Sequence, residues 1–70
     1  MLLKEPLSER ELEIIELVCE GLKNREIADN LFLSIRTIEG NRKRIANKTG
    51  TTNIAELVVY AIKHGIYVIN

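Results

Sequence analysis

Apolar residues recur along most of this chain at intervals of three and four positions, the spacing of one face of an α-helix. Polar or glycine-containing stretches divide them into four segments, and no two segments read convincingly as paired strands. The pattern therefore predicts an all-α, four-helix bundle-like domain with a central helix-turn-helix. The helices are expected at about 8–20, 25–31, 35–48 and 54–64.

The first helix has a well-marked beginning and end. Ser8 is the predicted N-cap, and Glu11 three residues later completes a capping box. Gly21 is the predicted stop, because glycine readily takes the left-handed backbone conformation that ends helices. The residues expected to face the core at helical spacing are Leu12, Ile15, Val18, Cys19 and Leu22.

The second helix is short, and a tight turn follows it. Asn24 is the expected cap, and Ile27 and Ala28 face inward. The elbow that follows includes Phe32, which is expected to pack into the core. Ser34 then caps the third helix.

The third helix carries few apolar residues. Ile38 and Ile45 lie two turns apart on one side, and the residues between them are polar or glycine. Such a helix is held to the core along a narrow stripe and leaves its other faces for a partner. Gly40 costs about 1 kcal/mol relative to alanine in a helix interior, which suggests that something approaches the backbone closely there.

The fourth helix is expected to begin at a cap supplied by Asn53 or Thr52 and to end at His64 and Gly65. The apolar tail 66–69 is expected to tuck against the core. The packing residues predicted on this helix are Leu57, Val58, Ala61 and Ile62.

Length and composition indicate one compact domain over 1–70, with 1–6 as a linker remnant or disordered start. Hydrophobic residues make up 46% of the 70 and charged residues 29%, which argues against disorder. No apolar run approaches the roughly 18 residues that cross a bilayer, and the N-terminus lacks a signal-peptide pattern. A cytoplasmic location away from membranes is therefore expected.

The net charge of zero hides a strong segregation of charge. Residues 1–20 carry two positive and six negative side chains, a net of −4, whereas residues 21–50 carry seven positive and three negative, a net of +4. A basic middle segment can be steered toward phosphate while the acidic part stays away.

The sequence offers little for catalysis or metal binding. Cys19 is the only cysteine and occupies an apolar helical position, so a core role is favoured over a redox role. His64 is the only histidine, and a capping role is favoured for it. Because no group of catalytic or metal-ligating side chains converges and no glycine-rich phosphate loop occurs, we expect no enzyme activity, metal or cofactor.

Four blocks of this sequence resemble the LuxR-type (GerE-like) helix-turn-helix DNA-binding domain, as found at the C-terminus of bacterial response regulators. In order, the blocks are LSEREL at 7–12, GLKNREIADNLFLS at 21–34, RTIEGNRKRIANKTG at 36–50, and NIAELVVYAIKHGI at 53–66. Together they cover most of the chain, and their order makes the resemblance specific.

The resemblance implies that the third helix enters the major groove and that the fourth supplies a dimer contact. The residues that match base-facing positions are Glu39, Gly40, Asn41 and Lys43. The residues that match positions near phosphates are Arg25, Ser34, Thr37, Arg42, Arg44, Lys48 and Asn53. The candidates for dimer contact are Val59, Tyr60 and Lys63.

Two base-facing positions depart from the family pattern. Asn41 stands where members commonly have His, and Asn pairs in a bidentate manner with adenine. Glu39 stands where many members have Lys, and a carboxylate accepts from cytosine but repels phosphate. Sequence preference is therefore not carried over from relatives.

Several of these residues have a structural alternative that the sequence leaves open. Arg25 can pair with Asp29 four residues later, and Lys48 can complement the carbonyl end of its helix. Ser34 is first of all a cap, and Thr37 can bond the backbone near the helix start. The fourth-helix candidates can likewise be ordinary surface.

The expected function is sequence-specific binding of double-stranded DNA, as the output domain of a bacterial transcription regulator. The resemblance further implies a homodimer on two half-sites about 10 bp apart and an upstream receiver or sensor domain. RNA polymerase is a candidate partner of the acidic first helix. The alternative is a helical protein-interaction module of the same fold that has lost DNA binding, which the zero net charge and Glu39 favour slightly.

Overall fold

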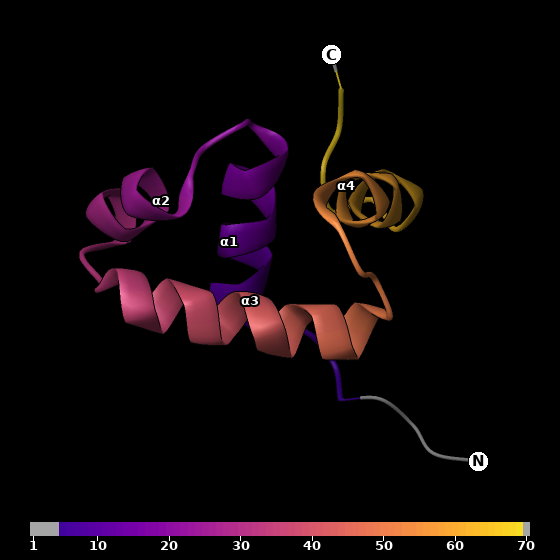
Figure 1. Cartoon of the computed structure of the whole chain (residues 1–70). Coiled ribbons are helices and arrows are strands. Elements are labelled where there is room, and N and C mark those ends of the chain that lie inside the picture. Colours follow the sequence, from indigo (N-terminus) through magenta and orange to yellow (C-terminus); the bar gives the residue numbers. More distant parts are fainter. Residues whose placement is uncertain (1–4, 70) are drawn as a thin grey trace.

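The computed structural model describes residues 5–69, and over that range the chain forms four helices joined by short turns (Figure 1). They are α1 (Glu9–Cys19), α2 (Asn24–Leu31), α3 (Ile35–Thr49) and α4 (Ile54–Lys63). The all-α prediction is confirmed, and the helix ends differ from the predicted ones by no more than one residue. The expectation of a linker or disordered start at 1–6 falls mainly on residues 1–4, which lie outside the described residues.

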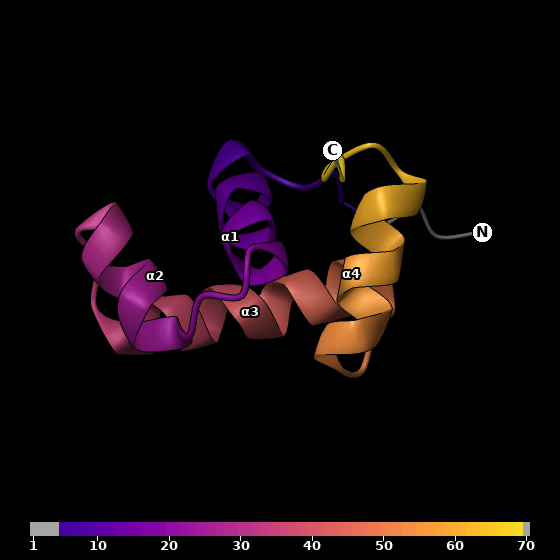
Figure 2. The same ribbon diagram turned by 90° about the horizontal axis from the view of Figure 1, so that it is seen from above.

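The fold is built around α1. This helix packs against each of the other three, while α3 packs against α2 at one end and α4 at the other. Figure 1 shows α3 lying crosswise along one face of the molecule, with α1 standing on it. Seen from above, α2 and α4 lie on opposite sides of α1 (Figure 2). The face of α3 turned away from α1 therefore lies at the surface.

The ends of α1 follow the predicted local signals. The Glu11 backbone N–H donates to Ser8 Oγ at 3.1 Å, and the Ser8 N–H donates to Glu11 Oε1 at 2.8 Å. This reciprocal pair is the predicted capping box. At the other end, Gly21 takes a φ of +92° and its N–H donates to the Val18 carbonyl, as expected for a glycine that ends a helix.

The predicted cap of α2 is wrong by one residue. Lys23 occupies the N-cap position, and Asn24 is the first residue of the helix. A lysine side chain has no acceptor to offer the exposed N–H groups. The Lys23 N–H itself donates to the Glu26 carboxylate at 2.8 Å. The Asn24 amide is consequently free for a contact with another helix.

Phe32 does not pack into the core as expected but is 94% exposed. It ends α2 with a φ of 58°, which makes it the one residue other than glycine with a positive φ within residues 5–69. Leu31 and Leu33 on either side of it pack against the core. The reversal of the chain at this point turns both leucines inward and Phe32 outward.

The core gathers apolar side chains from all four helices. Its buried members are Ile14, Ile15, Val18, Ile27, Ala28, Ile38, Ile45, Leu57 and Ala61. The predicted stripe on α1 omits Ile14, because a helix enclosed by three others buries a wider face than a single stripe. Ile62, predicted to pack, is exposed.

Only the first half of the segment after α4 packs against the core. Ile66 and Tyr67 pack against it, and both of their N–H groups donate to the Ala61 carbonyl. Val68 and Ile69 are exposed, so the expected tucking of 66–69 holds for its first half only. None of the helices between residues 5 and 69 is long and apolar enough to cross a membrane.

Candidate nucleic-acid interface

Two buried isoleucines hold α3 against the core, so that its polar face points toward solvent. Ile38 and Ile45 are almost completely buried, and they hold the helix on the core along one side. Between them, the predicted base-facing residues lie on the surface: Glu39, Gly40 and Lys43 are exposed and Asn41 is half-buried. The helix thus carries four solvent-accessible positions within two turns, on a face that no other helix between residues 5 and 69 covers.

Asn41 is held in a defined orientation. Its Nδ2 donates to the Thr37 carbonyl one turn earlier, at 2.8 Å. The amide oxygen and the second amide hydrogen have no partner within the described residues. An acceptor and a donor side by side are the groups that a bidentate contact to adenine requires.

Gly40 is not required by the fold. Apart from its chain neighbours and the nearby backbone of its own helix, a Cβ at this position would meet no atom of residues 5–69 within 4 Å. Nor is Gly40 among the glycines that take a positive φ in the described part of the chain. A mid-helix glycine that the free domain does not need is consistent with a close approach of a partner to the backbone.

Two hydroxyl groups meet at the start of α3. Ser34 Oγ accepts from the Thr37 N–H at 3.1 Å, and the two hydroxyl oxygens are 2.9 Å apart. Ser34 is therefore the cap that the sequence predicts, and Thr37 bonds it. Both side chains are exposed beside the N-terminus of the helix, where the helix dipole favours an anion.

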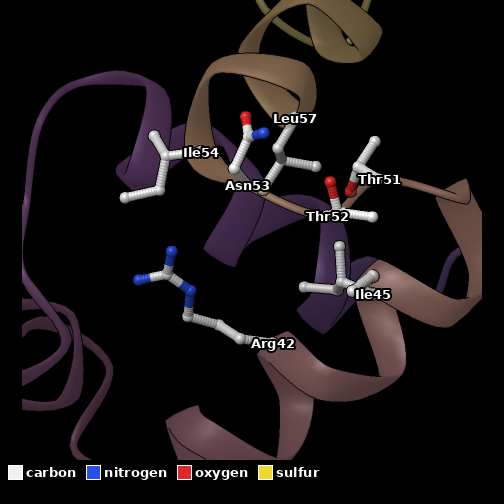
Figure 3. Close-up of a pocket in the computed structure, with 8 residues that line it drawn as sticks. Arg42, Ile45, Thr51, Thr52, Asn53, Ile54 and Leu57 are labelled. Carbon is white, nitrogen blue, oxygen red and sulfur yellow. The ribbon is translucent and has the colours of Figure 1, made fainter.

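Arg42 extends from α3 into the angle between α2 and α4. Its Nη1 donates to Asn24 Oδ1 at the start of α2, at 2.6 Å. Figure 3 shows the guanidinium directed toward Ile54 at the start of α4. It borders a hollow of about 160 Å³ that Asn53 also lines. Arg42 and Asn53, both predicted to lie near phosphates, are therefore brought together.

Asn53 has a structural role as well. Its Oδ1 accepts from the Glu56 backbone N–H at 2.8 Å, which makes it the N-cap of α4. The helices α2 and α4 both begin on the same side of the molecule, at the lower edge of Figure 2. Their N-termini thus add two partial positive charges near the Arg42 guanidinium.

Arg44 and Lys48 share one buried carboxylate. Lys48 Nζ lies 2.8 Å from Glu11 Oε1, and Arg44 Nε lies 3.5 Å from Glu11 Oε2. Lys48 also donates to the Pro6 carbonyl at 3.1 Å. The Lys48 side chain is only 14% exposed, whereas that of Arg44 is 59% exposed. The two cations therefore differ sharply in how freely they can meet a phosphate.

The sequence predicts only a capping role for Glu11, but its carboxylate also pairs with Lys48 and Arg44. Burial alone would raise the pKa of its carboxyl, but Lys48 and the hydrogen bonds from Ser8 outweigh burial and hold the pKa below its ordinary 4.5. The capping box accounted for Glu11 locally. The sequence pattern does not predict its contact with Lys48, which lies 37 residues away.

The remaining predicted phosphate contact, Arg25, is exposed at the start of α2. The alternative that paired it with Asp29 is not realised, because the ion pairs within residues 5–69 do not include it. The Arg25 side chain therefore reaches solvent.

The dimer candidates on α4 are not equally accessible. Val59 is 54% exposed and Lys63 is also exposed. Tyr60 is half-buried, and its ring stacks on that of His64 with the centroids 4.1 Å apart. The exposed Ile62 lies beside Val59 at helical spacing. The apolar part of this surface is therefore formed by Val59 and Ile62.

Cys19 lies half-buried against the core. Burial, together with the carboxylates of Glu16 and Glu20, raises the pKa of its thiol. A thiol that stays protonated is a poor nucleophile. Residues 5–69 contain no group of three His, Cys, Asp or Glu side chains placed to hold a metal ion.

Comparison with known proteins agrees with this geometry. Residues 5–61 match the family described as "Bacterial regulatory proteins, luxR family". The oxygen regulatory protein NreC of Staphylococcus aureus (strain JH9) is 47% identical over 57 residues, which are 81% of this chain and 26% of NreC. The same identity and coverage hold for NreC of strain USA300.

Two solved structures have the same fold. One is the response regulator ChrA of a heme-sensing two-component system, with a TM-score of 0.85, 32% identity, and coverage of 90% of this chain and 31% of ChrA. The other is VqmA of Vibrio cholera in a complex with ligand and DNA, with a TM-score of 0.80, 31% identity, and coverage of 89% and 27%.

The chain spans about a quarter to a third of the length of these relatives. Within that span, the four helices, the polar face of α3 and the sequence match coincide. The chain belongs to the luxR family of bacterial regulatory proteins, and its fold is the helix-turn-helix DNA-binding domain of that family's transcription regulators.

Proposed function

We propose that this domain binds duplex DNA in a sequence-specific manner, with α3 lying in the major groove. The observation that carries the proposal is the uncovered polar face of α3, which Ile38 and Ile45 hold in place from the opposite side. A groove about 12 Å wide admits such a helix. Binding, rather than catalysis, is the whole of the proposed activity.

Base recognition is assigned to the middle of α3. Asn41 reads adenine through its amide, which the Thr37 carbonyl orients. Lys43 donates to guanine, and Glu39 accepts from cytosine. Gly40 lets the backbone come close to the base edges.

Phosphate contacts are assigned to the rim around α3. Arg42, beside the starts of α2 and α4, meets one phosphate, with Asn53 lining the same hollow. A helix N-terminus favours an anion through its dipole and its free N–H groups. The other proposed contacts are Arg25, Ser34, Thr37 and Arg44.

A second copy of the chain completes the operator complex. One domain presents one α3, so two half-sites about 10 bp apart require a two-fold dimer. The exposed Val59 and Ile62 form the centre of the proposed contact, with Tyr60 and Lys63 at its edge.

In the full-length protein we propose a receiver or sensor domain before this one, because the relatives are three to four times as long as the matched region. That domain would gate DNA binding in the cytoplasm. A hollow of about 230 Å³ between α1 and α2, bordered by Glu13, Glu16 and Glu20, is the proposed contact surface for RNA polymerase.

Selection from a randomised operator library tests the function, because it yields site, spacing and symmetry together. Affinity should fall by orders of magnitude between about 50 and 200 mM salt, because each neutralised phosphate releases counterions. Absence of binding even near 50 mM would favour the protein-interaction alternative.

Within the same selection, Asn41→Ala should cost about 1–3 kcal/mol at one base step and relax the preference there. Its expected effect is local because one side chain reads one base pair. Equal losses on every sequence would remove Asn41 from base readout.

A further inference from the structure

We propose that Lys48 is a positioning residue rather than a phosphate contact, and that with Glu11 it fixes the angle at which α3 is presented to DNA. The inference rests on the proposed binding of DNA by α3. It assigns separate tasks to the two cations that share the Glu11 carboxylate: Lys48 holds the helix, and Arg44 meets the phosphate.

The contacts of Lys48 leave little of it for a ligand. Its ammonium donates to Glu11 Oε1 at 2.8 Å and to the Pro6 carbonyl at 3.1 Å, and its side chain is 14% exposed. An ammonium has three donors, so two are already used inside the domain. Arg44, with its Nε 3.5 Å from Glu11 and 59% exposure, is only loosely held.

The state of Glu11 explains why Lys48 stays in place. The carboxylate is 2% exposed and also accepts from the Ser8 N–H. If Lys48 left to meet a phosphate, the buried charge would keep the Ser8 N–H bond, but its only remaining cation would be the more distant Arg44. Removing one partner of a buried pair is strongly unfavourable, because the other charge stays desolvated. Arg44 can leave the carboxylate without this consequence, since Lys48 remains.

The pair connects distant parts of the chain. Glu11 lies in the first turn of α1, Pro6 lies in the segment that enters α1, and Lys48 lies in the last turn of α3. A second polar contact, from Arg42 to Asn24, joins the middle of α3 to α2. The helix is therefore tethered to both of its neighbours on the N-terminal side of the chain.

A small tilt of α3 would displace the side chains proposed to contact the bases. Asn41 lies four residues before the buried Ile45, about 6 Å along the helix axis. A tilt of about 10° around Ile45 would move the Asn41 backbone by about 1 Å, which is more than hydrogen-bond geometry tolerates. Lys48, on the other side of Ile45, is placed to prevent this tilt.

The direction in which one substitution changes DNA affinity distinguishes the two possible roles of Lys48. Glu11→Gln removes a negative charge and releases Lys48. If Lys48 were a phosphate ligand, this variant would bind DNA as well as or better than the unchanged chain. If Lys48 acts through Glu11, the variant should bind about two- to thirtyfold more weakly, the range typical of residues that act on a site through others.

The salt dependence of binding gives a second readout, with Arg44→Met as the matched control. Arg44→Met should flatten the slope of log affinity against log salt by about 0.9, the value for one phosphate contact. The double variant Glu11→Gln/Lys48→Met carries no unpaired buried charge and should fold. It should lose affinity with an unchanged slope. Circular dichroism at the assay temperature confirms that each variant is helical.

The outcomes are distinct. Tighter binding by Glu11→Gln, or a slope lowered by about one in the double variant, would make Lys48 a phosphate ligand and overturn the proposal. Unchanged affinity in both variants would leave the pair a purely structural contact and overturn it as well. Failure of the unchanged chain to bind library-selected duplex DNA would instead remove the proposed function, and this proposal with it.

Discussion

At position 40, the stability of the free domain and the proposed DNA binding favour different residues. Because a Cβ there would meet no described atom within 4 Å beyond its chain neighbours and its own helix backbone, Gly40→Ala should stabilise the free domain by up to about 1 kcal/mol through helix propensity. The added methyl group should at the same time weaken DNA binding if the groove approaches the backbone at this point. Thermal unfolding and DNA affinity, measured on the same preparation, give both numbers.

Asn47→Ala provides the matched control for this prediction. Asn47 is another exposed residue of α3 and is not among the proposed contacts. Its replacement should raise stability through helix propensity and leave affinity unchanged. If Gly40→Ala behaves in the same way, close approach at Gly40 is contradicted.

Glu11 should make the stability of the domain sensitive to acid. Its pKa in the folded state lies below the ordinary 4.5, with burial opposing and Lys48 and Ser8 producing the decrease. The folded state therefore binds this proton less readily than the unfolded state does. The stabilisation is complete above about pH 4.5 and is lost as the pH falls through the lower, folded-state pKa.

Unfolding by heat at a series of pH values from 7 downward would measure this dependence. Glu11→Gln should be less stable at neutral pH and lose less on acidification. Glu16→Gln, at an exposed position of the same helix, is the control and should follow the unchanged chain. Parallel curves for Glu11→Gln and the unchanged chain would contradict the linkage.

At the scale of the elements, signals close in sequence were sufficient to place the helices. Ser8, Ser34 and Asn53 cap as predicted because each capping bond spans only three residues. Glycine at 21 and 50 ends a helix for an equally local reason, its ease in positive φ. Fold class and helix limits therefore followed from the sequence.

Contacts between elements were not predictable in the same way. The bonds from Lys48 to Glu11 and from Arg42 to Asn24 span 37 and 18 residues, and their geometry is set by how the helices cross. The prediction that Phe32 packs into the core is wrong because hydrophobicity alone does not reveal which of three consecutive apolar residues a turn directs outward. The role of each cation on α3 is therefore a structural question, although the face that carries them follows from the sequence.

The exposed apolar part of α4 leads to a prediction about assembly. Val59→Glu should prevent the proposed two-fold contact, since it places a carboxylate where Val59 and Ile62 would meet their copies. Binding to DNA with two half-sites should then lose its cooperativity, while binding to a single half-site should persist. Gel-shift titrations on the two DNAs would measure this.

Val68→Glu is the control for that experiment. Val68 is 68% exposed, comparable to Val59 at 54%, but lies in the segment after α4. The same substitution there should leave cooperativity intact. Equal effects of the two variants would show that added negative charge, rather than a lost contact, weakens binding.

Over the whole molecule, two consecutive parts of the chain carry net charges of opposite sign. Residues 1–20 have a net charge of −4 and residues 21–50 a net charge of +4, within a body of 37 × 30 × 20 Å. The exposed carboxylates of Glu13, Glu16 and Glu20, the acidic face of α1, should repel DNA and thereby favour approach by α3. The range of this repulsion depends on the salt concentration, because the Debye length is about 30 Å at 0.01 M and about 8 Å at 0.15 M.

Replacing Glu16 and Glu20 together by Gln should therefore act on the rate of association more than on the final complex. At about 0.01 M salt the repulsion extends across the molecule, so the double variant should associate with DNA a few-fold faster. Near 0.15 M the two rates should coincide, because the Debye length is then shorter than the thinnest dimension of the domain, 20 Å. Stopped-flow measurements at both salt concentrations decide this. A gain that persists at 0.15 M would place these carboxylates close to the bound DNA and would contradict the orientation with α3 in the groove.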